Sequence, residues 1–348
     1  MKHKETFIAG FLVLILLAVV AFVAYKNTNP KSEISQDITS ALKTLPQDTN
    51  PLSIQVMRQK PYPGSKITIV QTLAPGTNYN QYIASYQSDG LTIYALLTVP
   101  TGEKPKNGWP AIIFNHGHIP PEQYRTTERY VAYVDGFARS GYIIFKPDYR
   151  GNGNSQGKPE GAYYSPAYAT DVLNALSSIK KYPDANPNKI GMWGHSMGGN
   201  ITLRSLVVDT TDIKAAVIWG GVVGSYADIM YNWHSASTFT PPERVQATVN
   251  SLRQNFIKQY GDPSSNSPFW NSMDPTHFLS DISAPIQLDV GGADEEVPPA
   301  FSESLYTKLK DLNKTVEFYS YPGSDHNISQ GFTLAMQRSI DFFDRYLK

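Results

Sequence analysis

The sequence has no cysteine among its 348 residues. This absence excludes disulfide bonds, thiolate metal ligands and a cysteine nucleophile. Net charge is also lacking, because 30 Lys and Arg residues balance 30 Asp and Glu residues. We therefore expect neither nucleic acid nor another polyanion as the main partner. The sequence contains no internal repeat, so its length leaves one large α/β domain or two smaller domains.

One long apolar run lies near the amino terminus. Residues 7–25 carry no charge and no proline, and at about 1.5 Å per residue such a run matches the roughly 30 Å hydrocarbon core of a bilayer. Lys2 and Lys4 precede it and should stay in the cytoplasm. We expect residues 1–25 to be a single-pass anchor in the cell membrane, with the catalytic part outside the cytoplasm. The alternative is a signal peptide cleaved near Ala21, which would make the protein secreted.

Polar residues fill the next segment, 26–60, and predict a stalk. The sequence then alternates between short β-branched or aromatic runs and amphipathic segments. Two of the first runs flank Asp89-Gly90, a pair typical of the turn of a β-hairpin. The alternation that follows predicts a mostly parallel sheet with helices on both faces, so we expect an α/β fold over residues 61–348.

Residues 222–284 interrupt this alternation. They are rich in Trp, Tyr, Asn, Ser and Pro. An insertion of this length between two sheet strands usually covers the carboxyl ends of the strands, where α/β sheets bind ligands. We therefore predict a cap over the site, and a helical spacer without a functional role is the alternative.

Residues 194–198, GHSMG, match the Gly-x-Ser-x-Gly pattern between a predicted strand and a predicted helix. In such a sharp turn the serine hydroxyl projects above the sheet, and the glycines leave room for the neighbouring strand and helix. Ser196 is therefore the candidate nucleophile, and a turn without a function is the alternative. Neighbouring side chains in a turn point apart, so we interpret His195 as structural.

A serine hydroxyl becomes a strong nucleophile when a base takes its proton and a third group orients that base. In α/β-hydrolases the chain order is Ser, acid, His. His326 follows the last predicted strand, whereas His234 and His277 lie in the predicted cap. Asp294 follows the preceding strand directly, so the predicted triad is Ser196, Asp294 and His326.

Acyl transfer also requires donors to the developing oxyanion, each worth about 3–4 kcal/mol in known cases. The backbone N–H of Met197, directly after the nucleophile, is one candidate. The backbone N–H of His118, in the loop that follows the predicted strand 111–117, is the second. We expect neither a metal ion nor an organic cofactor, because this chemistry needs none.

Five stretches resemble the catalytic domain of the prolyl oligopeptidase family, namely IIFNHGHIP, KPDYRGNGNSQG, IGMWGHSMGG, APIQLDVGGADEEVPP and SDHN. The resemblance covers roughly residues 85–348. It implies an α/β-hydrolase fold and assigns the nucleophile, acid and base to Ser196, Asp294 and His326. It also implies that residues 148–151, DYRG, form a structural loop that lines the cleft.

Two features depart from that family. Its peptidases usually carry a large amino-terminal β-propeller, and the segment between the predicted anchor and the first hydrolase strands is too short for one. Some members also place a tyrosine hydroxyl at the oxyanion site near the His-Gly loop, and residues 115–118 contain no tyrosine. We predict a serine hydrolase of small peptides, with a carboxylesterase as the alternative. An inactive hydrolase-fold adhesion or binding protein is the alternative from another class.

Overall fold

The computed structural model describes residues 50–233, 254–255, 257–265 and 267–348. The predicted anchor, residues 1–25, lies outside these ranges, and so does the predicted stalk up to residue 49. Within the described ranges no helix is long and apolar enough to cross a bilayer.

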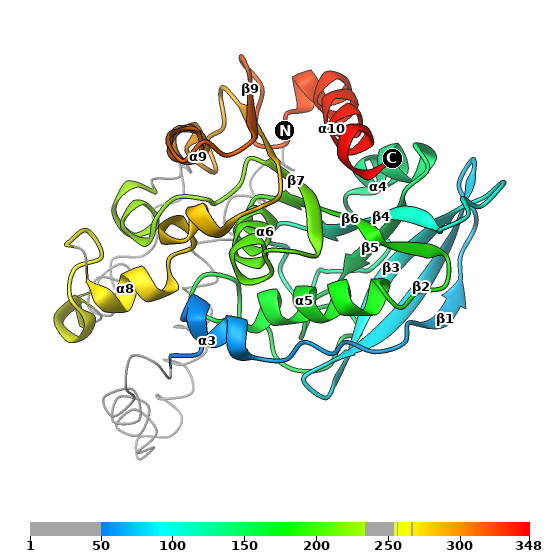
Figure 1. Cartoon of the computed structure of the whole chain (residues 1–348), viewed down its shortest axis with the longest axis horizontal. Coiled ribbons are helices and arrows are strands. Elements are labelled where there is room, and N and C mark those ends of the chain that lie inside the picture. Colours follow the sequence, from blue (N-terminus) through cyan, green and yellow to red (C-terminus); the bar gives the residue numbers. More distant parts are fainter. Residues whose placement is uncertain (1–49, 234–253, 256, 266) are drawn as a thin grey trace.

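A nine-stranded sheet forms the centre of the described chain, in the order β1-β2-β3-β5-β4-β6-β7-β8-β9 (Figure 1). The six strands from β5 to β9 in this order run parallel, and β1, β2 and β3 form an antiparallel extension at one edge. The strands are β1 (Thr68–Thr72), β2 (Tyr79–Ser88), β3 (Leu91–Pro100), β4 (Trp109–Asn115), β5 (Ile143–Pro147), β6 (Ala185–His195), β7 (Ile213–Trp219), β8 (Ile286–Gly291) and β9 (Val316–Tyr321). The predicted mostly parallel sheet is therefore confirmed.

The hairpin predicted at Asp89-Gly90 joins β2 to β3, with Ser88 paired to Leu91. Asp89 and Gly90 both have a positive φ, 50° and 78°. A two-residue hairpin turn of type I′ requires this conformation at both positions, and aspartate and glycine adopt it most easily.

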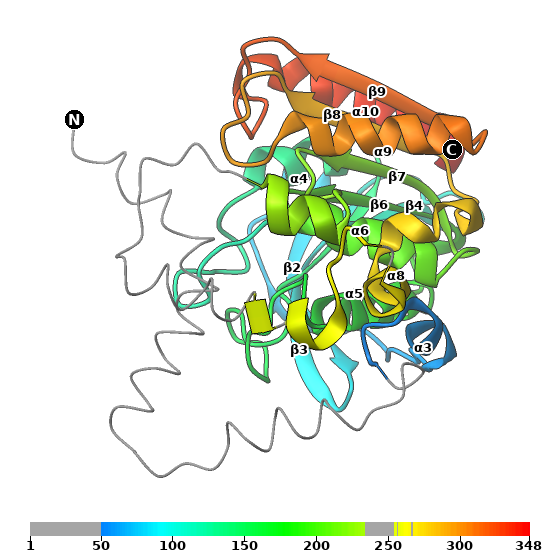
Figure 2. The same cartoon turned by 90° about the vertical axis from the view of Figure 1, so that its left-hand side faces the viewer.

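Helices cover both faces of the sheet. One apolar cluster on the first face includes residues of α3 (Ile54–Gln59), α5 (Ala167–Ile179), α6 (Met197–Val208) and α9 (Pro299–Asp311). A second cluster, on the opposite face, includes residues of α4 (Val131–Arg139) and α10 (Phe332–Leu347). Figure 2 shows α9 and α10 on the two sides of β8 and β9. Because helices cover both faces of the sheet, the central strands consist mainly of apolar residues.

Residues 50–60 correct the predicted boundary of the stalk. Ile54 and Met57 of α3 are buried in the core, and α3 packs against α6. Arg58 Nε donates a hydrogen bond of 2.8 Å to the carbonyl oxygen of Val207. This segment therefore belongs to the folded domain, and a helix of six residues is too short to leave a clear periodic signal in a polar stretch.

The described part of the insertion 222–284 contains short helical segments. They include a π-helical turn (Asp228–Asn232), α8 (Pro268–Met273) and two 3₁₀ turns (Pro275–His277 and Leu279–Asp281). The buried guanidinium of Arg204, on α6, donates to the carbonyl oxygens of Leu52 and Met273 and to Tyr226 Oη. The insertion is thus attached to the helix that follows the predicted nucleophile. His234 lies outside the described residues.

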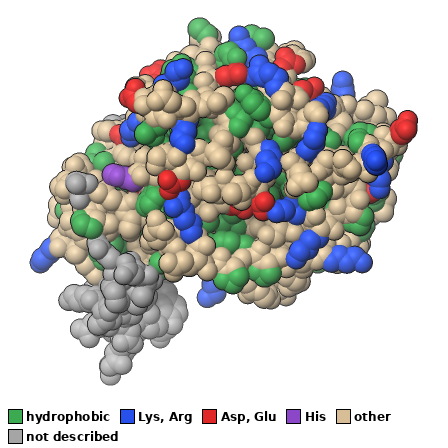
Figure 3. Space-filling view, viewed as in Figure 1, with side chains coloured by type: hydrophobic (Ala, Val, Ile, Leu, Met, Phe, Trp, Pro, Cys, Tyr) green, Lys and Arg blue, Asp and Glu red, His purple; other side chains and the backbone are tan. Residues whose placement is uncertain are grey.

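Charged side chains on the surface reflect the balanced composition. Over the face seen in Figure 3, basic and acidic side chains are interspersed among neutral ones.

Candidate active site

Ser196 lies between the end of β6 and the start of α6, with φ 56° and ψ −119°. A non-glycine residue held at such angles is strained by about 1–3 kcal/mol. The flanking glycines are required by space: a Cβ at Gly194 would lie 2.4 Å from the carbonyl oxygen of Gly198, and one at Gly198 would lie 1.9 Å from that of Asn115. The turn therefore has the sharp conformation expected from the sequence, and the Ser196 side chain stands at the carboxyl edge of the sheet.

Asp294 and His326 follow the adjacent parallel strands β8 and β9, so they lie at the same edge. Asp294 Oδ2 is 2.7 Å from His326 Nδ1, and both side chains are buried, with 1% and 6% exposed. The other oxygen of Asp294 accepts the backbone N–H groups of Glu296 and Val297, each at 2.9 Å. Because the carboxylate accepts, Nδ1 of the neutral ring carries the hydrogen and Nε2 is left as a proton acceptor.

The surroundings of His326 favour its protonated form. Burial opposes protonation, but the hydrogen bond to Asp294 and the charges of Asp294, Glu296 and Asp325 raise the pKa of His326 above its ordinary value. Glu296 Oε2 lies 3.9 Å from His326 Nε2, on a side chain that is 57% exposed. The charge of Glu296 therefore acts on the histidine across this separation.

The histidine ring lies beside the turn that carries Ser196. The rings of His195 and His326 are 4.6 Å apart, and a Cβ at Gly220 would lie 3.1 Å from His326 Nδ1. Gly220 follows Trp219, whose carbonyl oxygen accepts the Ser196 N–H at 3.1 Å. Within the described chain no hydrogen bond joins Ser196 Oγ to His326. Such contacts often tighten only when a substrate binds.

The two predicted oxyanion donors come from different segments that approach Ser196. Met197 is the first residue of α6, so its backbone N–H has no acceptor within the helix. His118 lies in the loop after β4, next to Gly117, where a Cβ would be 3.2 Å from the Ser196 Cβ. That loop therefore runs directly beside Ser196.

Tyr130 also reaches this loop, and sequence reasoning missed it. Its hydroxyl accepts the Gly117 N–H at 2.9 Å and lies 2.8 Å from His195 Nδ1. Tyr130 directly precedes α4, which begins at Val131, and both Arg129 and Tyr130 have a left-handed backbone, with φ 59° and 53°. Residues 115–118 contain no tyrosine, but Tyr130, which no motif marks, brings a tyrosine hydroxyl to the His-Gly loop from further along the chain.

The loop 148–151 lies beneath the His-Gly loop and does not line an open cleft. Asp148 and Tyr149 are fully buried. The hydroxyls of Tyr124 and Thr126 donate to Asp148 at 2.8 and 2.6 Å, and Tyr149 Oη donates to the carbonyl oxygen of His116 at 3.1 Å. Burial raises the pKa of Asp148 to about 6 and lowers that of His116 to about 3. This cluster thus supports the His-Gly loop through the hydrogen bond from Tyr149 to His116.

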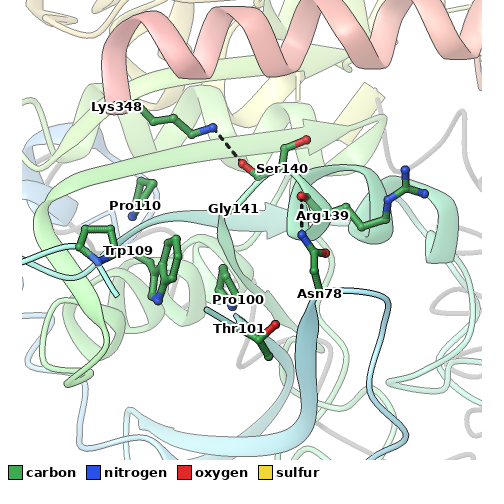
Figure 4. Close-up of a pocket in the computed structure, with 10 residues that line it drawn as sticks. Asn78, Pro100, Thr101, Trp109, Pro110, Arg139, Ser140, Gly141 and Lys348 are labelled. Atoms are coloured by element: carbon green, nitrogen blue, oxygen red, sulfur yellow. Dashed lines mark hydrogen bonds between the residues drawn. The ribbon is translucent and has the colours of Figure 1, made fainter. Parts of the chain in front are cut away.

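A separate open hollow of about 420 Å³ lies at the other end of the sheet (Figure 4). Trp109, at the amino end of β4, lines it together with Arg139 and Lys348. Lys348 Nζ donates to the carbonyl oxygen of Ser140 at 2.9 Å across its rim. None of the predicted site residues lines this hollow, so it is distinct from the candidate active site.

The architecture is that of the α/β-hydrolase class. Its marks are a mostly parallel sheet, a strained serine between strand and helix, and an Asp–His pair after the last two strands. Solved structures agree on the fold. An acetyl xylan esterase from Paenibacillus sp. R4 superposes with a TM-score of 0.64 and 19% identity over 87% of this chain and 96% of that chain. The acylaminoacyl peptidase of Pyrococcus horikoshii gives 0.59 and 20%, over 78% of this chain and 42% of that chain.

The sequence pattern of the prolyl oligopeptidase family matches residues 129–348, so the chain belongs to that family and is a serine hydrolase. A Bacillus subtilis (strain 168) relative, the uncharacterized peptidase YtmA, is 25% identical over 253 residues, which are 73% of this chain and 88% of the relative. Another from the same organism, the uncharacterized peptidase YuxL, is 24% identical over 70% of this chain and 34% of its own length. The resemblance noted in the sequence is thereby confirmed.

Proposed function

We propose that Ser196, Asp294 and His326 form the catalytic triad of this serine hydrolase and that its substrates are small peptides, with carboxylic esters as the alternative. The observation that carries the proposal is the 2.7 Å hydrogen bond between the buried Asp294 and His326, next to a serine held at φ 56°. Backbone strain and a buried Asp–His hydrogen bond are both typical of functional sites, and here they occur at one edge of the sheet.

In the proposed mechanism His326 Nε2 takes the proton of Ser196 while Oγ attacks the carbonyl carbon of the substrate. The backbone N–H groups of Met197 and His118 bind the oxyanion, and Asp294 stabilises the imidazolium. His326 then gives the proton to the leaving amine or alcohol. Water hydrolyses the acyl-enzyme with His326 again as the base.

Peptides and esters are both compatible with this chemistry, because the same acyl-enzyme forms from either. The family and the peptidase names of the Bacillus subtilis relatives favour peptides. The likeness to an acetyl xylan esterase keeps esters as the second candidate.

The insertion 222–284 is proposed as a cap that shapes the substrate pocket. Trp233 supports this role, because its indole N–H donates at 2.8 Å to the carbonyl oxygen of Glu296, two residues after Asp294. A cap of this kind contacts the substrate rather than the triad, so its contacts should act mainly on substrate binding. We expect Trp233→Ala to alter the ratio of KM values between substrates while fluorophosphonate labelling of Ser196 persists.

We further propose that residues 1–25 anchor the protein in the cell membrane, that residues 26–49 form a stalk, and that the catalytic domain faces away from the cytoplasm. The uncharged run 7–25 after Lys2 and Lys4 supports this topology. Protease added to intact cells should digest the catalytic domain if this is correct. Protection of the domain in intact cells would contradict it.

The decisive experiment compares the wild-type chain with Ser196→Ala. We expect a fluorophosphonate to label the wild type alone and hydrolysis of a p-nitrophenyl ester to fall by at least about 10⁴-fold in the variant. The ratio of peptide p-nitroanilide to ester rates in the wild type then separates a peptidase from an esterase. If folded wild-type protein is not labelled, the triad assignment is wrong.

A further inference from the structure

His195 makes two hydrogen bonds whose directions can be deduced. Its Nε2 lies 3.1 Å from the carbonyl oxygen of His326, and its Nδ1 lies 2.8 Å from Tyr130 Oη. Burial, followed by the proximity of His326, lowers the pKa of His195 to about 3, so the ring is neutral and carries one hydrogen. A carbonyl oxygen only accepts, so that hydrogen is on Nε2.

The rest of the chain follows from this tautomer. Since Nδ1 of His195 must accept, the Tyr130 hydroxyl donates its hydrogen to it. The Tyr130 oxygen in turn accepts the Gly117 N–H at 2.9 Å. One hydrogen-bond chain therefore results, in which each group donates to the next. It runs from the Gly117 N–H through Tyr130 and His195 to the His326 carbonyl oxygen.

This hydrogen-bond chain connects the three loops that surround Ser196. It starts in the loop after β4, one residue before His118, passes the residue that precedes the nucleophile, and ends on the backbone of His326. A Cβ at Gly117 would lie 2.7 Å from Tyr130 Oη, which shows how closely these loops approach. The Gly117 N–H is used within the chain, so it is not a donor for an oxyanion.

Tyr130 is held in place with a strained backbone. Its left-handed backbone is unusual for a residue with a large side chain, and such strain concentrates at functional sites. Edge-on ring contacts with Phe114, Trp193 and His195 fix the phenol against the sheet. The surrounding rings therefore keep the hydroxyl aimed at the oxyanion loop.

We propose that Tyr130 and His195 are positioning residues that hold the oxyanion loop and the loop of the base at a fixed spacing around Ser196. The inference rests on the proposed triad. Without one link, the His118 amide and the His326 ring can each shift relative to the nucleophile. A misplacement of about 1 Å can cost on the order of 100-fold in rate, although substrate contacts are untouched.

The first test is Tyr130→Phe in the full chain, which removes only the hydroxyl. We expect kcat per fluorophosphonate-titrated site to fall by about 10-fold, with KM within about twofold of the wild type. The matched control is Tyr142→Phe, which removes a hydroxyl bonded to Asp344 at 2.6 Å at the amino end of β5. The control should keep the wild-type kcat. A Tyr130→Phe kcat within about twofold of the wild type overturns the inference.

The second test uses His195→Gln alone and combined with Tyr130→Phe. The glutamine amide can donate near the place of Nε2, but its oxygen does not occupy the place of Nδ1, where Tyr130 needs an acceptor, so each variant interrupts the same chain. The double variant should be about as slow as the slower single variant. Multiplying effects, or a lowered Tm with unchanged kcat per titrated site, would show a merely structural role.

Failure of the two proposals can be told apart. Wild-type protein that resists fluorophosphonate labelling contradicts the triad, whereas labelled wild type with a fully active Tyr130→Phe contradicts only the positioning role. If Tyr130→Phe does not fold, His195→Gln carries the test with the same twofold threshold.

Discussion

Two buried clusters, one around Asp171 and one around Asp294, use the same carboxylate chemistry for different ends. Asp171 accepts Ser88 Oγ at 2.7 Å, the Arg150 N–H at 2.9 Å and Arg150 Nη2 at 2.7 Å. It thereby joins the β2–β3 hairpin, the loop after β5 and α5. Both oxygens of Asp171 accept hydrogen bonds and the Arg150 guanidinium faces them, so the buried charge of Asp171 is compensated.

Asp294 also accepts hydrogen bonds on both carboxylate oxygens, but its cluster leaves one proton acceptor unused. Its partner His326 carries no hydrogen bond on Nε2 within the described residues, and faces Glu296 at 3.9 Å. Ser196 is also partly accessible. In this comparison a saturated buried carboxylate stabilises the fold, whereas the other is coupled to an unused proton acceptor, as the proposed catalysis requires.

Asp294→Asn should produce the largest functional effect. An amide in place of the carboxylate favours the wrong histidine tautomer and no longer stabilises the imidazolium, so we expect kcat to fall by about 10⁴-fold. The Tm should change little compared with this loss. Ester hydrolysis and a thermal melt on the same sample measure both. A kcat reduced by less than tenfold would contradict the proposed role.

Asp171→Ala should lower the stability of the fold and leave the activity of the folded protein nearly unchanged. It leaves the buried Arg150 guanidinium with only Asp89, at 3.3 Å, so we expect the free energy of unfolding to fall by about 3–5 kcal/mol. The kcat per titrated site should stay near that of the wild type. Asp281→Ala is the control, because it breaks a surface pair with Arg58 and should cost less than about 1 kcal/mol. Equal losses from the two substitutions would refute the distinction.

Asp289→Asn tests a third buried carboxylate, one whose cluster responds to pH. Asp289 accepts the Tyr321 hydroxyl at 2.7 Å and the Gln287 amide at 2.6 Å, and burial raises its pKa to about 7. Because the folded pKa exceeds the unfolded value of about 3.9, this group's stabilisation is present below about pH 4 and is lost as pH rises through about 7. The variant should show a smaller change in Tm between pH 5 and pH 8. An unchanged difference would count against this linkage.

Glu296→Gln should have the smallest effect. The Glu296 carboxylate helps to raise the pKa of His326, which must be neutral to act as a base. Removing that charge lowers the pKa of His326, so activity should persist to lower pH, and the acid limb of kcat/KM should shift down by a fraction of a unit. Glu295→Gln, one residue earlier, serves as the control. A shift toward higher pH would show that the assigned cause is wrong.

Local patterns carried much of the information on the fold and the candidate site. The hairpin at Asp89-Gly90 and the turn at Ser196 could be predicted because both depend on the φ angles of a few adjacent residues. The pairing of Asp294 with His326 could be anticipated because each follows a strand of one parallel sheet. The burial of α3 could not be predicted, because a helix of six residues does not reveal which surface it will cover.

By itself, the sequence determined the alternation of strands and helices, the strained serine turn and the chain order of the candidate triad. These are properties of spacing and backbone stereochemistry. Only the tertiary structure decided that Tyr130, Gly117 and His195 meet, that Asp148 is buried, and that Glu296 faces His326. The physical reason is that such contacts depend on the order of β5, β4 and β6 in the sheet and on the close approach of their following loops. Neither is encoded in the spacing of residues along a single segment.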